Sequence, residues 1–353
     1  MNKQCEDHGK KIVHGVASSS PRGKLAAALF ALFAASASHA AALPEGVAKQ
    51  LGESLPAAFT PIPASGSAKM FPVVSEKMQS YDRKYAISIE GSPFAVTAVG
   101  EGGKVVEMLV PAGLHSKEFT KRWFKVDDLF GKVKWNLEPY EPAVPCLAYF
   151  NGGKTGEELV AKIPKGTSCT SLGTVALGKS KFRLVQLRQT FSAAGEECPF
   201  MVVCVRENPP VTTQSEYDAR AKQLMAEHAF REGRPWGTMF PSLLGNTGCF
   251  ECAAMAADFS TYMFDGGLQT GERFDKADDI RSGDVIYKAN HFFAVVYRKG
   301  AQLTTIEGNM NASVSKSTTR YAVKDGKLLS GGKDACFEYG YHNWTPAVGK
   351  RGK

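Results

Sequence analysis

The chain has 353 residues, of which 43% are hydrophobic and 22% are charged. This composition is typical of a folded globular protein and excludes disordered, collagen-like and low-complexity chains, while the length favours two domains over one. The 43 basic and 35 acidic side chains give a net charge of +8, spread along the chain rather than gathered in one block. Because no stripe of Arg and Lys interleaves with aromatic residues, we expect no nucleic-acid partner.

The first forty residues have the pattern of a secretory signal peptide. An apolar run from Leu25 to Ala37 follows Arg22 and Lys24, and small residues come after it, up to about Ala40. The run is far shorter than the ~20 residues of a membrane-spanning helix, and no other run approaches that length. We therefore predict a signal peptide over residues 1–40, an exported protein that is periplasmic or secreted, and no stable membrane span.

Export changes how the cysteines are interpreted, because disulfides form in oxidising compartments. Cys5 leaves with the signal peptide, and seven cysteines remain: Cys146, Cys169, Cys198, Cys204, Cys249, Cys252 and Cys336. Seven thiols predict three disulfides and one leftover thiol, with Cys198 paired to Cys204 or these two paired to Cys146 and Cys169. The leftover thiol is an accident, an intermolecular partner, or a thiol kept reduced for chemistry.

Changes of pattern divide the chain into segments. Residues 41–69 are rich in Pro, Ala, Gly and Ser, which predicts a tether with one short helix. Residues 70–205 contain short runs of β-formers separated by Gly-rich turns, typical of a β-barrel or sandwich. A polar, Pro-containing break over residues 206–214 predicts a linker, and apolar residues at helical spacing begin after Ser215. Residues 215–353 form the candidate catalytic domain.

The segment from Gly248 onwards carries the candidate nucleophile. A turn over residues 245–248 leads into an Ala-rich run that predicts a buried helix, with Cys252 in its first turn. A thiol at that position feels the positive end of the helix dipole and nearby unsatisfied N–H groups, which lower its pKa. Cys252 is therefore the predicted nucleophile. Cys249, whose helical stripe is poorer, is the predicted disulfide partner and the second choice of nucleophile.

Three predicted strands follow further along the chain. His291 opens the second strand, and Thr305, Glu307 and Asn309 alternate to one face of the third. A polar residue on an adjacent strand can hold a histidine in the right tautomer beside a thiol. We expect His291 to act as the base, with Glu307 or Asn309 as the third catalytic residue. His342 is kept as a reserve base, and His228 is interpreted as a packed or surface residue.

Together these residues resemble the papain-like superfamily in its compact bacterial form, the NlpC-type endopeptidases and the cysteine, histidine-dependent amidohydrolases. GRPWG at Gly233 resembles the Pro-aromatic-x-Gly turn before the nucleophile, and Glu251-Cys252 stands where these enzymes carry Asp-Cys. RSGDV at Arg281 resembles their Pro-Gly-Asp strand entry, and FFAVVY after His291 resembles their apolar strand. IEGN at Ile306 resembles the Glu-x-Asn strand of the amidohydrolases. The resemblance covers residues 215–311.

The resemblance implies an α+β protein, in which a β-rich N-terminal domain precedes a papain-like domain with the nucleophile helix packed on an antiparallel sheet. It implies attack by Cys252 on an amide carbonyl, proton transfer by His291, orientation of His291 by Glu307, and no cofactor or metal. Papain has a disulfide-bonded cysteine three residues before its nucleophile, the place of Cys249 here. Asn246 stands where papain-type enzymes place an oxyanion glutamine, and Trp236 replaces the tyrosine beside the oxyanion site.

The predicted function is that of an exported cysteine hydrolase that cleaves amide bonds in peptidoglycan peptides, whose anionic character suits a modestly basic chain. Three alternatives stay open. One is an inactive exported binding or scaffold module, because Ala253, Ala254 and Met255 replace the usual residues around the nucleophile. Another is a toxin-like cysteine protease that acts on protein. The third, a zinc site of Cys249, Cys252, Cys336 and a histidine, is disfavoured because no second CxxC is present. The oligomeric state is left open.

Overall fold

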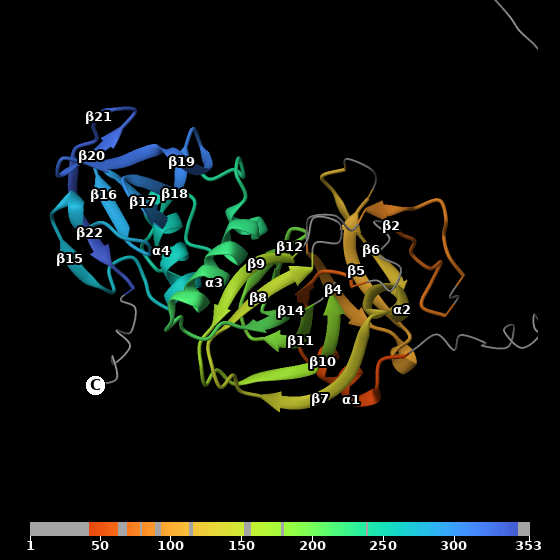
Figure 1. The fold of residues 1–353 in the computed structure, drawn as a ribbon. Coiled ribbons are helices and arrows are strands. Elements are labelled where there is room, and N and C mark those ends of the chain that lie inside the picture. The colour runs from red at the N-terminus through yellow and green to blue at the C-terminus, as the bar shows by residue number, and fades with distance from the viewer. Residues whose placement is uncertain are drawn as a thin grey trace, which may run out of the picture. The chain divides into compact units, whose positions relative to one another are not determined.

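The structure is a computed structural model that describes residues 42–62, 69–77, 80–88, 93–112, 116–151, 157–177, 180–237 and 239–344. The predicted signal peptide lies outside these described residues. The described chain is rich in strands, and most strands belong to a sheet of ten or a sheet of eight (Figure 1). Two short hairpins pair β2 (Lys69–Met70) with β3 (Ile87–Ser88) and β12 (Phe191–Ala193) with β13 (Glu196–Cys198).

The ten-stranded sheet is mixed, and its strands run in the order β6, β5, β4, β1, β14, β11, β10 and β7, with β8 joining β14 to β9. Only β1 and β14 are parallel among its described pairs. The β-rich character expected after residue 70 is therefore confirmed, in the form of one large mixed sheet. Its strands are β1 (Ala57–Phe59), β4 (Phe94–Val99), β5 (Val105–Pro111), β6 (Phe119–Lys125), β7 (Val133–Tyr140), β8 (Cys146–Asn151), β9 (Glu157–Ile163), β10 (Cys169–Leu177), β11 (Ser180–Leu187) and β14 (Phe200–Glu207).

Part of the segment expected to be a tether is built into this sheet. Helix α1 (Glu45–Gly52) buries Val47 and Leu51, which lie four residues apart and so share one helix face. The three-residue strand β1 then inserts between β4 and β14, with all its residues buried. The described residues 42–62 therefore contribute core side chains to this part of the molecule, namely Leu43, Val47, Leu51, Ala57, Phe59 and Ile62.

The eight-stranded sheet is antiparallel throughout and curled, in the order β15, β22, β16, β17, β18, β19, β20 and β21. Helix α4 (Glu251–Phe264) packs against β17 and β18 (Figure 1). The strands are β15 (Glu272–Phe274), β16 (Val285–Lys288), β17 (His291–Lys299), β18 (Gln302–Met310), β19 (Ser313–Lys324), β20 (Lys327–Ser330), β21 (Lys333–Asp334) and β22 (Phe337–His342). A helix packed on an antiparallel sheet is thus observed where the sequence predicts it.

Short side chains explain why α4 can lie so close to the sheet. Ala254, Met255 and Phe259 of the helix share one core with Ala294 and Ile306 of the two strands. The alanines in the first two turns of α4 have short side chains, so the helix backbone can approach the sheet. The side chains of the strands fill the space between helix and sheet. The other helices are α2 (Val126–Phe130), α3 (Gln214–Ala226) and the 3₁₀ turns η1 (Glu101–Gly103), η3 (His228–Phe230) and η4 (Ala277–Asp279).

The sequence pattern predicts Ser215 as the cap of a helix, whereas helix α3 begins at Gln214 and its cap is Thr213. Thr213 caps it by accepting a hydrogen bond from the Glu216 backbone N–H, and the Glu216 carboxylate accepts one from the Thr213 backbone N–H. Within the described residues, no helix combines the length and apolar character that crossing a bilayer requires.

The expected disulfides are absent, and this prediction is wrong for the structure described. None of the seven cysteines predicted to remain in the mature chain forms a disulfide in the described structure. The reason is clearest for Cys198 and Cys204. Along β14, Met201 and Val203 face the same core as Cys198, whereas Cys204 points into the core on the other face of the sheet. A disulfide between these two thiols would have to pass through the sheet, which disulfide geometry does not allow.

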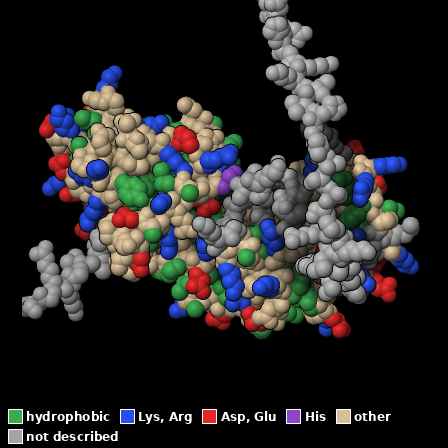
Figure 2. All heavy atoms as spheres, turned by 45° about the vertical axis from the view of Figure 1, so that its right-hand side comes forward, with side chains coloured by type: hydrophobic (Ala, Val, Ile, Leu, Met, Phe, Trp, Pro, Cys, Tyr) green, Lys and Arg blue, Asp and Glu red, His purple; other side chains and the backbone are tan. Residues whose placement is uncertain are grey.

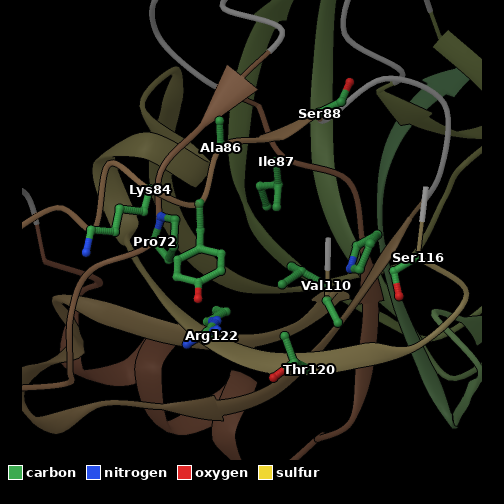
Figure 3. A pocket seen from close by; sticks show the side chains of 12 residues that line it. Pro72, Lys84, Ala86, Ile87, Ser88, Val110, Ser116, Thr120 and Arg122 are labelled. Atoms are coloured by element: carbon green, nitrogen blue, oxygen red, sulfur yellow. The ribbon is translucent and has the colours of Figure 1, made fainter. Parts of the chain in front are cut away.

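Charged side chains are interspersed on the face shown in Figure 2, where Lys and Arg lie among Asp and Glu. A hollow of about 630 Å³ opens beside β3, β5 and β6 (Figure 3). Its lining includes Ile87, Val110 and Pro72, with Arg122 and Lys84 among the polar residues. The hollow belongs to the ten-stranded sheet, whereas the predicted catalytic residues all lie on α4 and the eight-stranded sheet.

Candidate active site

The backbone immediately before Cys252 is held in an unusual conformation. Glu251 has a φ of +57°, which non-glycine residues adopt rarely, and three hydrogen bonds fix it there. Its N–H donates to the Phe240 carbonyl (3.0 Å), its carbonyl accepts from the Trp236 indole (2.7 Å), and its carboxylate accepts from the Asn309 amide (3.3 Å). Cys252 is the next residue, in the first turn of α4, as the sequence predicts.

A tight hairpin places the imidazole. Residues Ala289 and Asn290 both have positive φ (43° and 64°) between the paired ends Lys288 and His291, the pattern of a two-residue hairpin turn. Asn tolerates this conformation well, and its side-chain oxygen accepts a hydrogen bond from the Tyr287 hydroxyl (2.9 Å). His291 is therefore the first residue of β17, and its side chain is 18% exposed.

The carboxylate of Glu307 is fully buried and meets His291 across the β17–β18 pair. The His291 Nε2 lies 3.1 Å from one carboxylate oxygen, Oε2, which also accepts from the Tyr321 hydroxyl at 3.1 Å. The other oxygen accepts from the Arg320 guanidinium at 2.7 Å and from the Thr305 hydroxyl at 3.4 Å. A buried carboxylate with four donors stays ionised, because each donor favours the charged form.

These contacts set the charge states of the thiol and the imidazole. Burial raises the pKa of the Cys252 thiol, but hydrogen bonds from His291 and the Phe292 and Ala253 N–H groups outweigh burial and lower it. The Phe292 N–H lies 3.4 Å from the sulfur. Burial lowers the pKa of His291, but its hydrogen bonds and attraction to Cys252 and Glu307 raise it to about 9. The geometry favours a thiolate beside an imidazolium.

The pKa of Glu307 is lowered, which agrees with a charged imidazolium beside it. Burial raises it, whereas the hydrogen bond to His291 and the charge of Arg320 lower it, and the net change is downward. With Nε2 turned to Glu307, the Nδ1 atom of His291 is the one left for the sulfur. His291 thus contacts both of the other predicted residues, Cys252 and Glu307.

Asn309 has a different position from the one that strict alternation predicts. The β18–β19 register shifts between Glu307 and Met310, and Asn309 has a φ of +60°. This bulge turns Asn309 to Glu251, so in the described structure Glu307 rather than Asn309 contacts His291. Gly308 between them lies against Trp236, where an added Cβ would be 2.6 Å from an indole carbon.

The remaining sequence candidates lie in structural roles. The Asn246 amide binds Ser242, Asp258 and Thr261. The pKa of Cys249 is raised by burial and by the charge of Asp258, which makes it a poorer nucleophile than Cys252.

Two of the other histidines make no described contact with the thiol. His342 is buried, with Nδ1 3.0 Å from the Asp284 carboxylate, and His228 lies in η3. Among the described residues, no group of three or more His, Cys, Asp or Glu side chains could hold a metal ion.

Arg320 and Tyr321 are functional candidates that sequence reasoning missed. Both lie on β19 and donate to the buried Glu307 carboxylate, so they hold in place the carboxylate that contacts His291. Tyr321 is itself fixed by stacking on Phe293 with ring centroids 4.6 Å apart. No local spacing marks either residue, because their contact with Glu307 arises from strand pairing.

Comparisons with known proteins add little to this geometry. No family model and no curated protein matches the chain. Among solved structures it is similar to NlpC2 from Trichomonas vaginalis, over 78% of this chain and 94% of that one. The two share 12% sequence identity with a TM-score of 0.23, and a TM-score this low does not establish a shared fold.

Proposed function

We propose that this protein is an exported cysteine hydrolase that cleaves amide bonds. The observation that carries the proposal is the series Cys252, His291 and buried Glu307, in which the thiol pKa is lowered and the imidazole pKa is raised to about 9. A thiol ionised by an adjacent base, with a third group orienting that base, is the arrangement of nucleophilic catalysis. Its order along the chain also agrees with the resemblance to papain-like enzymes.

The residues divide the reaction between them. The Cys252 thiolate attacks the amide carbonyl carbon, and the negative charge moves to the carbonyl oxygen, where backbone N–H groups at the start of α4 stabilise it. His291 gives its proton to the departing amine as the C–N bond breaks, which leaves a thioester on Cys252. His291 then takes a proton from water, the resulting hydroxide attacks the thioester, and the carboxylic acid product leaves with the thiolate restored.

The charge states predict a bell-shaped dependence of kcat/KM on pH. Below the lowered pKa of Cys252 the thiol is protonated and the rate falls. Above about pH 9, His291 loses the proton that the leaving amine needs, and the rate falls again. Measurement of kcat/KM for a peptide substrate over a range of pH checks this. The Arg320→Met variant should shift the pH values at which kcat/KM falls. An alkaline limb near pH 6.5, the usual imidazole value, would contradict the assignment.

The substrate expected from the sequence is a cell-wall peptide, which is anionic and suits the modest excess of 38 basic over 33 acidic side chains that remains after residues 1–40 are removed. Digestion of purified peptidoglycan with the mature protein, followed by mass identification of the fragments, tests this part of the proposal. New amino termini that are absent with the Cys252→Ala variant support it, and an undigested sacculus contradicts it.

A second candidate substrate is a protein chain, and one observation favours it over the cell wall. Two large apolar side chains close to Cys252 in sequence, Met239 and Phe250, are exposed to solvent. Short cell-wall peptides of small and charged residues would leave such side chains without a partner.

A further inference from the structure

An apolar rim borders the nucleophile. We use this name for Met239, Pro241 and Phe250, all of which are exposed, Met239 at 72% and Phe250 at 45%. Among the described residues from Gln214 to Trp344, Met239 and Phe250 are the only exposed large hydrophobic side chains, and the exposed Pro241 lies between them in the sequence. Exposed apolar side chains that gather in one place commonly mark a surface that binds a partner or substrate.

Backbone pairing brings the rim to Cys252. Pro241 and Phe250 face one another in an antiparallel bridge, flanked by two hydrogen bonds, from Ser242 N–H to the Cys249 carbonyl and from Glu251 N–H to the Phe240 carbonyl. Met239 precedes Phe240 and Cys252 follows Glu251, so both lie next to the second hydrogen bond, one on each of the two paired segments. Met239 of the rim and the nucleophile therefore lie at the same end of the two paired segments.

A buried side chain, Trp236, holds the two segments that carry the rim. Trp236 is fully buried, lies against Phe240 in a tilted arrangement with ring centroids 4.9 Å apart, and donates to the Glu251 carbonyl. Met239 has a φ of +70°, a conformation that is rare for a bulky residue and typical of functional sites when the surroundings hold it. The chain thus keeps a long apolar side chain out in water beside a reactive thiol, although the adjacent Phe240 is partly buried.

The strand residue whose backbone N–H contacts the sulfur belongs to a row of aromatic side chains. Phe292, whose N–H contacts the Cys252 sulfur, is partly exposed and packs on Tyr287 with centroids 4.7 Å apart. Tyr287 in turn stacks on Tyr339 at 4.8 Å, across three adjacent strands. A row of aromatic side chains on three adjacent strands therefore begins at Phe292, the residue whose N–H contacts the thiol.

We propose that the apolar rim is a substrate subsite that takes a bulky apolar side chain of a polypeptide next to the cleaved amide. The inference rests on the proposed function and refines its substrate class. The side chain covers Met239 and Phe250 and removes their apolar surface from water. Discrimination by an apolar subsite is moderate, so we expect a preference for Leu or Phe over Asp of about ten- to a hundred-fold in kcat/KM.

Cleavage of internally quenched peptides tests the subsite. A positional library identifies the selective position, and kcat/KM is then compared for paired peptides with Leu or Asp there. The double variant Met239→Ser/Phe250→Ser should reduce the preference for Leu to less than about threefold. The matched control is Phe119→Ser, because Phe119 on β6 is exposed to nearly the same extent (43%) and should leave the preference unchanged.

A binding measurement separates failure of the subsite from failure of the proposed function. In the Cys252→Ala background, fluorescence anisotropy of the labelled Leu and Asp peptides reports recognition without turnover. Tighter binding of the Leu peptide that the double rim variant abolishes supports the subsite, even if the unmodified protein cleaves nothing and the hydrolase proposal falls. Equal binding and equal cleavage of both peptides, or a preference that survives the double variant, overturns it.

Discussion

Replacement of Cys252 by Ala is expected to lower kcat by about 10⁴-fold or more, because removal of the nucleophile leaves only substrate binding and the oxyanion donors. Circular dichroism should show an unchanged fold, since the residue is small and only partly buried. The rate of peptide cleavage under single-turnover conditions measures the loss.

The matched control for this variant is Cys249→Ala, three residues earlier in the chain. The pKa of the Cys249 thiol is raised by burial, and it is not in contact with His291 in any described interaction, so its variant should keep most of the activity. If the Cys249 variant were inactive and the Cys252 variant active, the nucleophile would be misassigned.

The Glu307→Gln variant should lose activity and stability together. Gln cannot accept from His291 with a full negative charge, so the pKa of His291 falls and the imidazolium is lost, at a cost of about 10² to 10⁴ in kcat. The change also leaves Arg320 without its carboxylate, which costs about 3 kcal/mol of the free energy of unfolding. Urea unfolding and the pH dependence of kcat measure the two effects.

A second substitution separates these effects. Arg320→Met in the Glu307→Gln background removes the unpaired cation and should recover much of the stability while leaving kcat low. Recovery of both quantities would show that Glu307 acts only through folding, and an unchanged kcat in Glu307→Gln would show that it does not orient His291.

Local patterns predicted the parts of the site that depend on local structure. The turn before an Ala-rich run is enough to place Cys252 in the first turn of α4. Alternation along a strand is enough to bring Thr305 and Glu307 to one face. The functional roles of these residues remain predictions, whereas their positions follow from helix and strand periodicity.

The parts that sequence reasoning missed depend on contacts between distant segments. The bulge between Glu307 and Met310 turns Asn309 to Glu251 rather than His291, and Trp236, which lies against Gly308 and leaves no room for a side chain there, comes from a distant segment. Arg320 contacts Glu307 only through the pairing of β18 and β19.

The N-terminal segment and the cysteines illustrate the same limit. Strand β1 is three residues long and pairs in parallel with β14, far along the chain, so its composition alone resembles a linker. The absent Cys198–Cys204 disulfide depends on which face of the sheet each thiol occupies, and spacing along the chain does not determine that.

The central claim is that Cys252 is ionised by contact with His291. The most direct measurement is alkylation by iodoacetamide at about pH 6, where a thiol of ordinary pKa near 8.5 is almost fully protonated. Intact-mass and peptide analysis should then show one fast addition, at Cys252, which disappears in the Cys252→Ser variant and slows in Glu307→Gln. If the exposed Cys336 were labelled as fast as Cys252, or if Cys252 reacted only above pH 8.5, the claim would be contradicted.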